Sequence, residues 1–220
     1  MRAMDWSSLK LGPIEDWPQS LRTSVSTCLN SRFAILIWWG PDLIMLYNDA
    51  YREIIASKHP AALGHPGRDC WPEIWDTIGP MLEGVMQSGE ATWSDDLLLL
   101  LARHGYPEEC YFTFSYSPIS DESGGIGGVF TPVMETTERV VGERRSNTLR
   151  ELAATSVEGR SESRMCELAA EVLGRNRFDI SFAVLYRVSP DREHLEARSW
   201  TGISPDHVLC RGEKQLNEEQ

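Results

Sequence analysis

Positive charge is scarce in this chain of 220 residues. Lysine and arginine together number 21 against 33 aspartates and glutamates, which gives a formal net charge of −12. Proteins that bind nucleic acid or anionic lipid surfaces use an excess of basic side chains for both tasks. The charge balance therefore predicts neither a nucleic-acid partner nor a membrane partner.

Long apolar runs and paired cysteines are also missing. The longest apolar run, over 97–102, is far too short to span a bilayer, and no basic segment followed by an apolar core opens the chain, so no secretory signal is expected. The cysteines are odd in number and form no Cys-x-x-Cys pair; they are Cys28, Cys70, Cys110, Cys166 and Cys210. Such scattered cysteines are typical of a reducing compartment, and we expect a cytoplasmic protein.

Hydrophobic residues make up 41% of the chain, which is ample for a packed core. At this length we expect one complete domain with additional material, or two small domains. Pro18 and the apolar spacing after it predict a helix over 16–29. The remaining pattern up to residue 133 predicts helices over 50–58, 71–75 and 78–88, and strands over 33–39, 43–48, 93–101, 110–119 and 127–133.

Strict alternation marks the strand around 111–117. Phe112, Phe114 and Tyr116 share one face of it, and polar side chains occupy the other. The next segment, 134–160, is polar and helical in pattern, with an imperfect heptad that favours weak dimerisation over an autonomous coiled coil. A helix over 162–174 and a hairpin of strands over 180–188 and 195–200 complete the expected elements.

Several short motifs together resemble a PAS domain of the type found at the front of bacterial sensor histidine kinases. They are Gly12–Pro18, Tyr47-Asn48-Asp49-Ala50-Tyr51, Gly67, Trp71-Pro72-Glu73-Ile74-Trp75, Tyr111–Ile119 and Gly128-Val129-Phe130. Glu135-Thr136-Thr137-Glu138 stands where PAS domains carry the junction to their signalling helix. Residues from about 147 onward resemble the first helix and first two strands of a GAF domain, and the resemblance stops about halfway through such a domain.

The resemblance implies an α+β fold with a five-stranded antiparallel sheet and helices on one face. It implies four segments: an N-terminal helical segment (1–30), a PAS-like sensor domain (31–134), a signalling helix (135–160) and a partial GAF-like domain (161–220). The implied function is the sensory input of a two-component signal-transduction protein, in which a small ligand or partner acts on a downstream histidine kinase or other effector. A homodimer is implied, and no catalysis is expected from this chain.

Gly67-Arg68-Asp69-Cys70 is similar to the Gly-x-Asn-Cys segment of flavin-binding LOV domains, whose cysteine forms a photoadduct. The likeness ends there. Trp71-Pro72-Glu73-Ile74 replaces the Arg-Phe-Leu-Gln that contacts the flavin in that branch, and the strand at 128–133 lacks its glutamine. We therefore do not expect flavin, and a small buried cysteine is the simpler interpretation of Cys70.

Haem and metal are not expected either. Some PAS sensors hold haem through a histidine on a helix, but His59 and His65 fall in a proline-flanked loop and His104 lies at a strand end. A metal site built from His59, His65 and Cys70 needs three ligands from one loop and a fourth from elsewhere. The sequence thus leaves any cofactor unknown.

Candidate ligand-binding residues are the aromatic and polar side chains that a PAS-like cavity gathers. They are Trp39, Asn48, Cys70, Trp75, Phe112, Phe114 and Tyr116. Core packing is the competing interpretation of the aromatics, and capping of the next helix that of Asn48. Glu135 and Thr137 are the candidates for signal relay. Two alternatives stay open, a flavin photoreceptor and a ligand-free dimerisation module.

Overall fold

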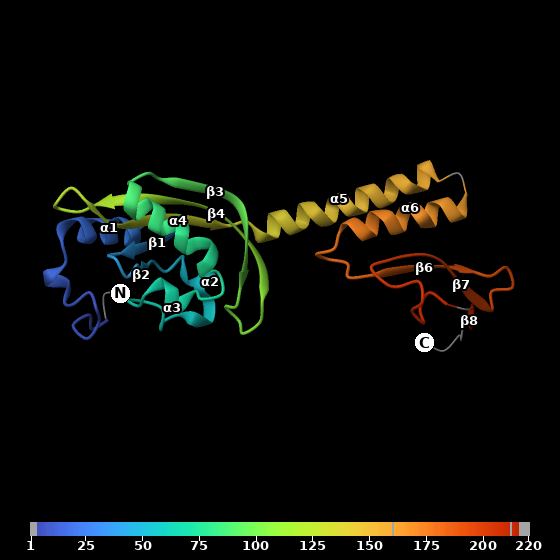
Figure 1. The fold of residues 1–220 in the computed structure, drawn as a ribbon, viewed down its shortest axis with the longest axis horizontal. Coiled ribbons are helices and arrows are strands. Elements are labelled where there is room, and N and C mark those ends of the chain that lie inside the picture. Colours follow the sequence, from blue (N-terminus) through green and yellow to red (C-terminus); the bar gives the residue numbers. More distant parts are fainter. Residues whose placement is uncertain (1–3, 160, 212, 216–220) are drawn as a thin grey trace. The chain divides into compact units, whose positions relative to one another are not determined.

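The computed structural model describes residues 4–159, 161–211 and 213–215, so the ends of the predicted segments 1–30 and 161–220 lie outside the described residues. The chain divides into two compact units, Met1–Val140 and Val141–Gln220. Figure 1 shows the first as a sheet with surrounding helices and the second as helices with a smaller sheet.

The first unit contains the predicted five-stranded antiparallel sheet, in the order β2-β1-β5-β4-β3. Its strands are β1 (Ala34–Trp39), β2 (Ile44–Tyr47), β3 (Thr92–Leu101), β4 (Glu108–Ser120) and β5 (Ile126–Glu135). The first strand, β1, is an interior strand of the sheet, since it pairs with β2 on one side and with the last strand, β5, on the other. This arrangement, together with the helices around it, confirms the predicted fold class.

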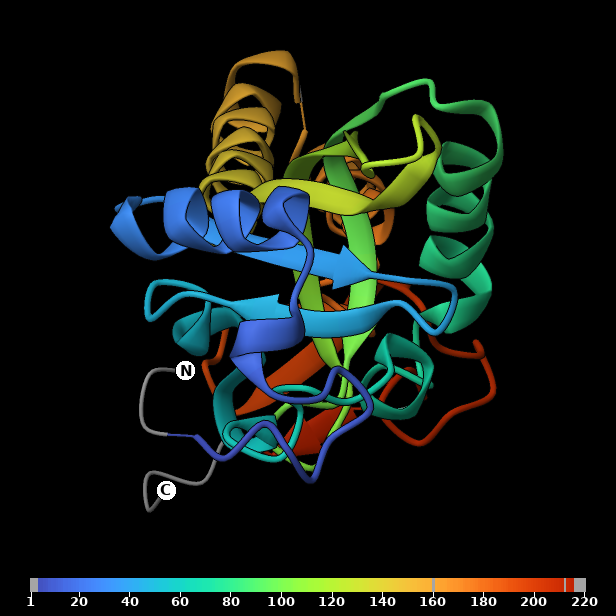
Figure 2. The same cartoon turned by 90° about the vertical axis from the view of Figure 1, so that its left-hand side faces the viewer.

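In the described part of the chain, two helices precede β1, and four more lie between β2 and β3. They are η1 (Ile14–Asp16), α1 (Gln19–Asn30), α2 (Arg52–Ile55), η2 (Ala56–Lys58), α3 (Gly67–Cys70) and α4 (Trp75–Ser88). Figure 2 shows α1 running alongside β1, and α4 beside the strands of the other half. Ile35–Trp39 are all buried, so both faces of β1 are covered. The apolar stripe predicted for 78–88 is the buried face of α4, and Gly89 ends this helix in the left-handed conformation.

The helix predicted over 71–75 is wrong. The helical turn in this region is α3, which ends at Cys70, and residues 71–74 form a turn before α4. The cause is Pro72, because a residue that precedes proline avoids the α conformation, and Trp71 has φ −125° and ψ 48°. α3 itself depends on Gly67, where a Cβ atom would lie 2.2 Å from the Trp38 ring.

Asn48 fixes how three segments meet. Its side-chain oxygen accepts hydrogen bonds from the backbone N–H groups of Ile35 and Tyr51, both at 3.1 Å. Its side-chain nitrogen lies 3.1, 3.3 and 2.7 Å from the carbonyl oxygens of Cys28, Ser31 and Phe33. The side chain is 3% exposed, so these bonds form away from water. One carboxamide therefore joins the end of α1, the start of β1 and the start of α2.

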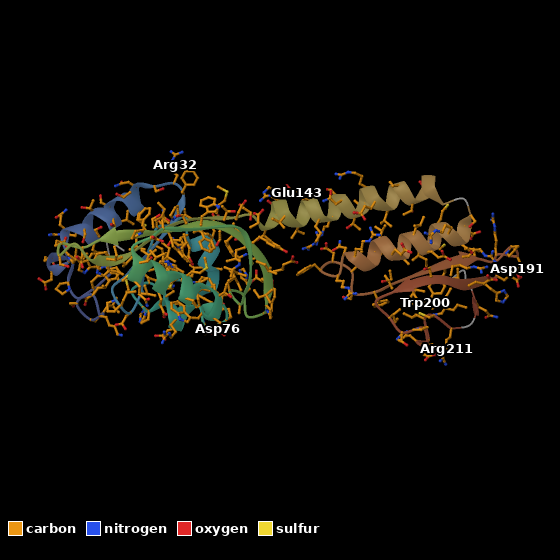
Figure 3. The ribbon with its side chains drawn as sticks, turned by 45° about the horizontal axis from the view of Figure 1, so that its top comes forward. Arg32, Asp76, Glu143, Asp191, Trp200 and Arg211 are labelled. Carbon is orange, nitrogen blue, oxygen red and sulfur yellow. The ribbon has the colours of Figure 1, made fainter. Side chains whose placement is uncertain are left out.

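The second unit holds most of a long helix and a small sheet. Its elements are α5 (Thr137–Glu158, which begins in the first unit), α6 (Glu162–Arg175), β6 (Ala183–Val188), β7 (His194–Thr201) and β8 (Glu213–Gln215). The sheet is antiparallel in the order β6-β7-β8, so the predicted hairpin gains a partner, β8, that the sequence did not indicate. The described residues of β6 pair only with β7. Figure 3 shows Asp191 in the turn between β6 and β7.

Asp179 connects α5 with the segment after α6. Its carboxylate accepts hydrogen bonds from Arg144 at 2.8 Å, from Arg145 at 3.0 Å and from Asn176 at 3.0 Å. The hydrogen bonds from Arg144, Asn176 and Arg145 lower the pKa of Asp179 far below its usual value, against the opposing effect of burial. The contribution of Asp179 to stability is thus fully present above the pKa of an ordinary aspartate and declines as the pH falls from there toward the lowered pKa of the folded state.

None of the described helices combines the length and the apolar content needed to cross a membrane.

Replacing Asn48 with alanine is expected to destabilise the first unit by about 2–4 kcal/mol, because several buried backbone groups lose their partner at once. Chemical denaturation followed by intrinsic fluorescence measures this loss. Asn30→Ala is the matched control: Asn30 is exposed and makes a single local bond to Ser26, so it should cost about 0.5 kcal/mol or less. Equal losses for the two variants would contradict the role assigned to Asn48.

Candidate functional site

A small cavity lies between the sheet and the segments that cover it. Its volume is about 40 Å³. The sheet contributes side chains from β1, β3, β4 and β5, and the covering segments contribute side chains from α2, the 71–74 turn and α4. The lining residues are Leu36, Trp38, Tyr51, Ile54, Trp71, Ile74, Ile78, Leu99, Leu101, Phe112, Phe114, Tyr116, Thr131 and Val133. We call this space the sheet cavity.

The alternation of β4 brings its aromatic side chains to the sheet cavity. Phe112, Phe114 and Tyr116 are all buried there, and the Phe114 and Tyr116 rings lie 4.7 Å apart between centroids. Three of the seven ligand-binding candidates named from the sequence therefore share one wall. Trp38 and Trp71, whose aromatic side chains the sequence also offered as lining for a cavity, border it as well. Position on a strand predicted the first three, whereas the inward direction of Trp71 depends on the turn before α4.

The other four candidates do not border the sheet cavity. The carboxamide of Asn48 is fully engaged with backbone groups, as described above. The Trp39 ring lies against Gly127 and Gly128, and the Trp75 ring packs edge-on against Trp38 at 6.2 Å. Cys70 is half-buried on α3, with its sulfur 3.7 Å from the carbonyl oxygen of Ala62. Each of these side chains has a packing or hydrogen-bonding task that explains its burial.

The polar atoms of the sheet cavity are few. The Trp38 indole N–H donates to the Thr131 hydroxyl at 3.1 Å, and the Trp71 indole N–H donates to the Tyr51 hydroxyl. Tyr116 differs from these two pairs: its side chain is 3% exposed, and no described residue makes a hydrogen bond with its hydroxyl. Burial raises the pKa of Tyr116, and the nearby Tyr51 raises it further, so the hydroxyl keeps its proton at neutral pH.

The 71–74 turn covers the sheet cavity and is held by charges outside it. Lys58 lies 2.6 Å from the Glu73 carboxylate, 2.6 Å from the Cys70 carbonyl oxygen and 4.1 Å from the Trp71 ring centroid. The Glu73 carboxylate also accepts the backbone N–H of Ala102 at 2.9 Å. Burial raises the pKa of Glu73, but the bonds from Lys58 and Ala102 outweigh it, so the net shift is downward.

The carboxyl end of β5 leads from the sheet cavity to α5. Val133 lines the cavity and is paired with Phe114, and Glu135 ends the strand two residues later. The helix begins at Thr137 and not at residue 135 as predicted, because β5 continues to pair with β4 through Glu135. The Thr137 hydroxyl accepts the backbone N–H of Tyr111 at 3.0 Å and donates to Glu135 at 3.0 Å. Both relay candidates thus lie at the junction between strand and helix.

A flavin does not fit these residues. The sheet cavity is small, its wall carries no cationic side chain for a phosphate, and Cys70 lies outside it. Burial raises the pKa of the Cys70 thiol to about 11, with a further contribution from Asp69. The thiol is therefore protonated at neutral pH, and its surroundings do not favour a nucleophilic thiolate.

The described residues that line the sheet cavity include no histidine or cysteine that could ligate haem or a metal ion. The three histidines considered for haem all lie away from the sheet cavity and have other partners: His59 bonds Tyr47 at 3.0 Å, His65 bonds the Leu63 carbonyl and His104 bonds Glu108 at 2.8 Å. Among the described residues, the one group with metal-ligand spacing is Asp191, Glu193 and His194 in the hairpin of the second unit. Asp191 is exposed there and accepts hydrogen bonds from Ser189 and from the backbone of Glu193, which accounts for its position.

Comparison with known proteins agrees with the fold described above. The family described as PAS fold matches residues 30–141. No curated protein matches the sequence.

Several solved structures are similar to this chain. The chain is similar to a sensory box sensor histidine kinase from Vibrio cholerae, with 19% identity over 52% of this chain and 90% of that chain and a TM-score of 0.38. The Rhodobacter sphaeroides LOV protein is 12% identical over 63% and 78% of the two chains (TM-score 0.45). The PAS domain of Bordetella pertussis BvgS is 21% identical over 60% and 96% (TM-score 0.46).

Alkylation of Cys70 is expected to accelerate about tenfold for each pH unit between 7 and 10, because only the thiolate reacts and its pKa is about 11. Iodoacetamide labelling of the folded protein, read by mass spectrometry of the peptide that contains Cys70, measures the rate. Glutathione in the same reaction is the control, and its alkylation rate should level off at a lower pH than that of Cys70. A plateau for Cys70 near pH 8 would show an activated thiol and revive the photoadduct alternative.

Proposed function

Because the chain belongs to the PAS fold family, we propose that it is the sensory input region of a signal-transduction protein, with the sheet cavity as sensor and α5 as relay. The observation that carries the proposal is the double role of β5. Val133 forms part of the cavity wall, and the same strand positions the first residue of α5 through Glu135 and Thr137. A change in the wall therefore has a short covalent path to the helix.

Arg103 strengthens this path. Its guanidinium makes two parallel hydrogen bonds to Glu135 at 2.8 and 2.9 Å and a third to the carbonyl oxygen of Ile54 at 3.3 Å. The Arg103 side chain is 11% exposed, and Ile54 lines the sheet cavity. Two-pronged bonds of this kind hold orientation as well as distance. One side chain thus joins α2, the β3–β4 hairpin and the strand end that precedes α5.

Asp96 makes a second contact with the start of the helix. A β-bulge between Ser94 and Leu97 places Asp96 at φ +48°. Its carboxylate accepts the Thr136 hydroxyl at 2.7 Å and lies 2.5 and 2.6 Å from the Arg139 guanidinium. Bulges of this kind redirect a side chain out of the regular ladder. Here the redirected carboxylate meets the beginning of α5, where the helix dipole favours negative charge.

The finer parts of the proposal concern the parent protein. We propose that the output is a histidine kinase, that residues from about 161 onward are the beginning of a GAF-like domain, and that α5 contributes to a homodimer. The imperfect heptad of α5 supports a helix that dimerises only with help from neighbouring domains. The absence of disulfides among the cysteines supports a reducing, cytoplasmic setting.

A ligand-free dimerisation module is the second candidate, and the size of the sheet cavity favours it. A volume of about 40 Å³ is well below the roughly 150 Å³ of an engineered apolar cavity that binds benzene. Native mass spectrometry of the purified chain separates the two candidates, since it reports bound small molecules and subunit number together. A ligand-free dimer favours the second candidate, and a bound small molecule favours the first.

Replacing Arg103 with methionine is expected to uncouple the sheet from α5. Hydrogen exchange of the backbone amides at 136–140 should accelerate more than tenfold, and the free energy of unfolding should fall by about 2–3 kcal/mol because Glu135 loses its two-pronged partner. Lys10→Met is the matched control: the Lys10–Asp42 pair is exposed, and its loss should leave the amides at 136–140 unchanged. Unchanged exchange in Arg103→Met would contradict the relay.

A further inference from the structure

The Tyr116 hydroxyl is a polar group in the wall of the sheet cavity to which the fold and the proposed relay assign no role. The other hydroxyls of the sheet cavity, on Tyr51 and Thr131, each accept an indole N–H. Tyr116 is as deeply buried and lines the same space, yet none of the described residues bonds its hydroxyl. The Tyr116 side chain borders the cavity without a hydrogen bond to any described residue, so its hydroxyl marks the point at which an occupant of the cavity can make one.

The wall of the sheet cavity sets the charge of that occupant. No aspartate, glutamate, lysine, arginine or histidine is among its lining residues. Lys58 and Arg103, which contact the lining residues Trp71 and Ile54, are already paired with Glu73 and Glu135. A carboxylate or phosphate that entered would lose its hydration without gaining a counterion. The occupant is therefore uncharged.

Aromatic rings in the wall of the sheet cavity set the shape of the occupant. Trp38, Trp71, Phe112, Phe114 and Tyr116 all contribute faces or edges to the wall, and rings of this kind pack best against another ring. The present volume of about 40 Å³ must grow to roughly 150 Å³ for a six-membered ring. The 71–74 turn and Tyr51 are the parts of the wall outside regular secondary structure, and of these the turn contributes two lining side chains, so we expect it to yield.

We infer that the sheet cavity takes a small, uncharged, ring-shaped molecule with one hydrogen-bonding group, which meets the Tyr116 hydroxyl. This inference rests on the proposed sensory function and narrows it to one class of ligand. It excludes dicarboxylates, nucleotides and phosphorylated cofactors on the basis of charge. It assigns Tyr116 as the residue that selects the polar group of the ligand, and the apolar wall as the source of most of the binding.

Three probes of nearly the same shape test the inference on the full chain: phenol, benzene and benzoate. Dissociation constants come from titrations monitored through the backbone amide signals of β4. Phenol is expected to bind about five- to tenfold more tightly than benzene, because it gains one hydrogen bond. Benzoate is expected to bind more weakly than either. Benzoate binding as tight as that of phenol, or no phenol binding at millimolar concentration, overturns the inference.

Tyr116→Phe separates the hydrogen bond from the packing. The variant removes a hydroxyl that has no partner, so it should fold, and its phenol-to-benzene ratio should fall below about twofold. Tyr47→Phe is the matched control, since it also removes a buried tyrosine hydroxyl, but one that bonds His59 and does not line the cavity; the ratio should stay at the wild-type value. A Tyr116→Phe variant that keeps the full ratio contradicts the role of Tyr116.

The same samples distinguish this inference from the proposed function. Hydrogen exchange of the amides at 136–140 is measured with and without phenol. Slower or faster exchange supports both proposals. Phenol binding with no change in these amides leaves the ligand class intact and contradicts the relay through α5. A change in the amides caused equally by benzoate contradicts the ligand class and leaves the relay intact.

Discussion

The structure of the first unit depends on how one buried carboxamide is used. Asn48 follows β2 directly, and its side chain satisfies backbone groups at the end of α1, the start of β1 and the start of α2. Without it, those groups are buried without partners, because the segments they belong to end at irregular backbone and not in a ladder. The position of α2 in turn decides where Tyr51 and Ile54 meet the sheet cavity. A single polar residue therefore sets the geometry of an otherwise apolar space.

The cover of the sheet cavity and the start of α5 are connected through two neighbouring residues. Glu73 in the 71–74 turn accepts the backbone N–H of Ala102, and Arg103 binds Glu135. A displacement of the turn thus acts on the β3–β4 hairpin next to the arginine that orients the strand end. Coupling of this kind needs an element with two alternative arrangements. In the proposed relay this element is the 71–74 turn, because its contacts are a few charged bonds and not a continuous ladder.

Much of the first unit could be predicted from the sequence because its signals are local. The alternation around Phe114 gave the inward face of β4, and the apolar stripe that ends at Gly89 gave α4. The error at 71–75 arose where two rules compete, since Pro72 suits a first helical turn but also ends the helix before it. The start of α5 was placed two residues early because strand pairing, a long-range effect, holds Glu135 in β5.

The candidate site was harder to predict for a related reason. Side chains on a strand have a fixed direction, so Phe112, Phe114 and Tyr116 were found, whereas Trp39 and Trp75 satisfy the same composition but face other neighbours. The sequence offered two roles for Asn48, ligand binding and capping of the next helix. Only the position of five backbone groups around its side chain distinguishes these roles. The missing partner of the Tyr116 hydroxyl has no sequence signal at all, because it depends on what every surrounding residue does.

The chemistry of the sheet cavity also limits how strongly any occupant can act. A small ring has few atoms, and the best small ligands gain no more than about 1.5 kcal/mol per non-hydrogen atom. Part of that gain is spent on moving the 71–74 turn away from Lys58 and Ala102. Only the difference in affinity between the two arrangements can shift their populations. The proposed sensor therefore requires two arrangements that differ little in free energy before the occupant binds.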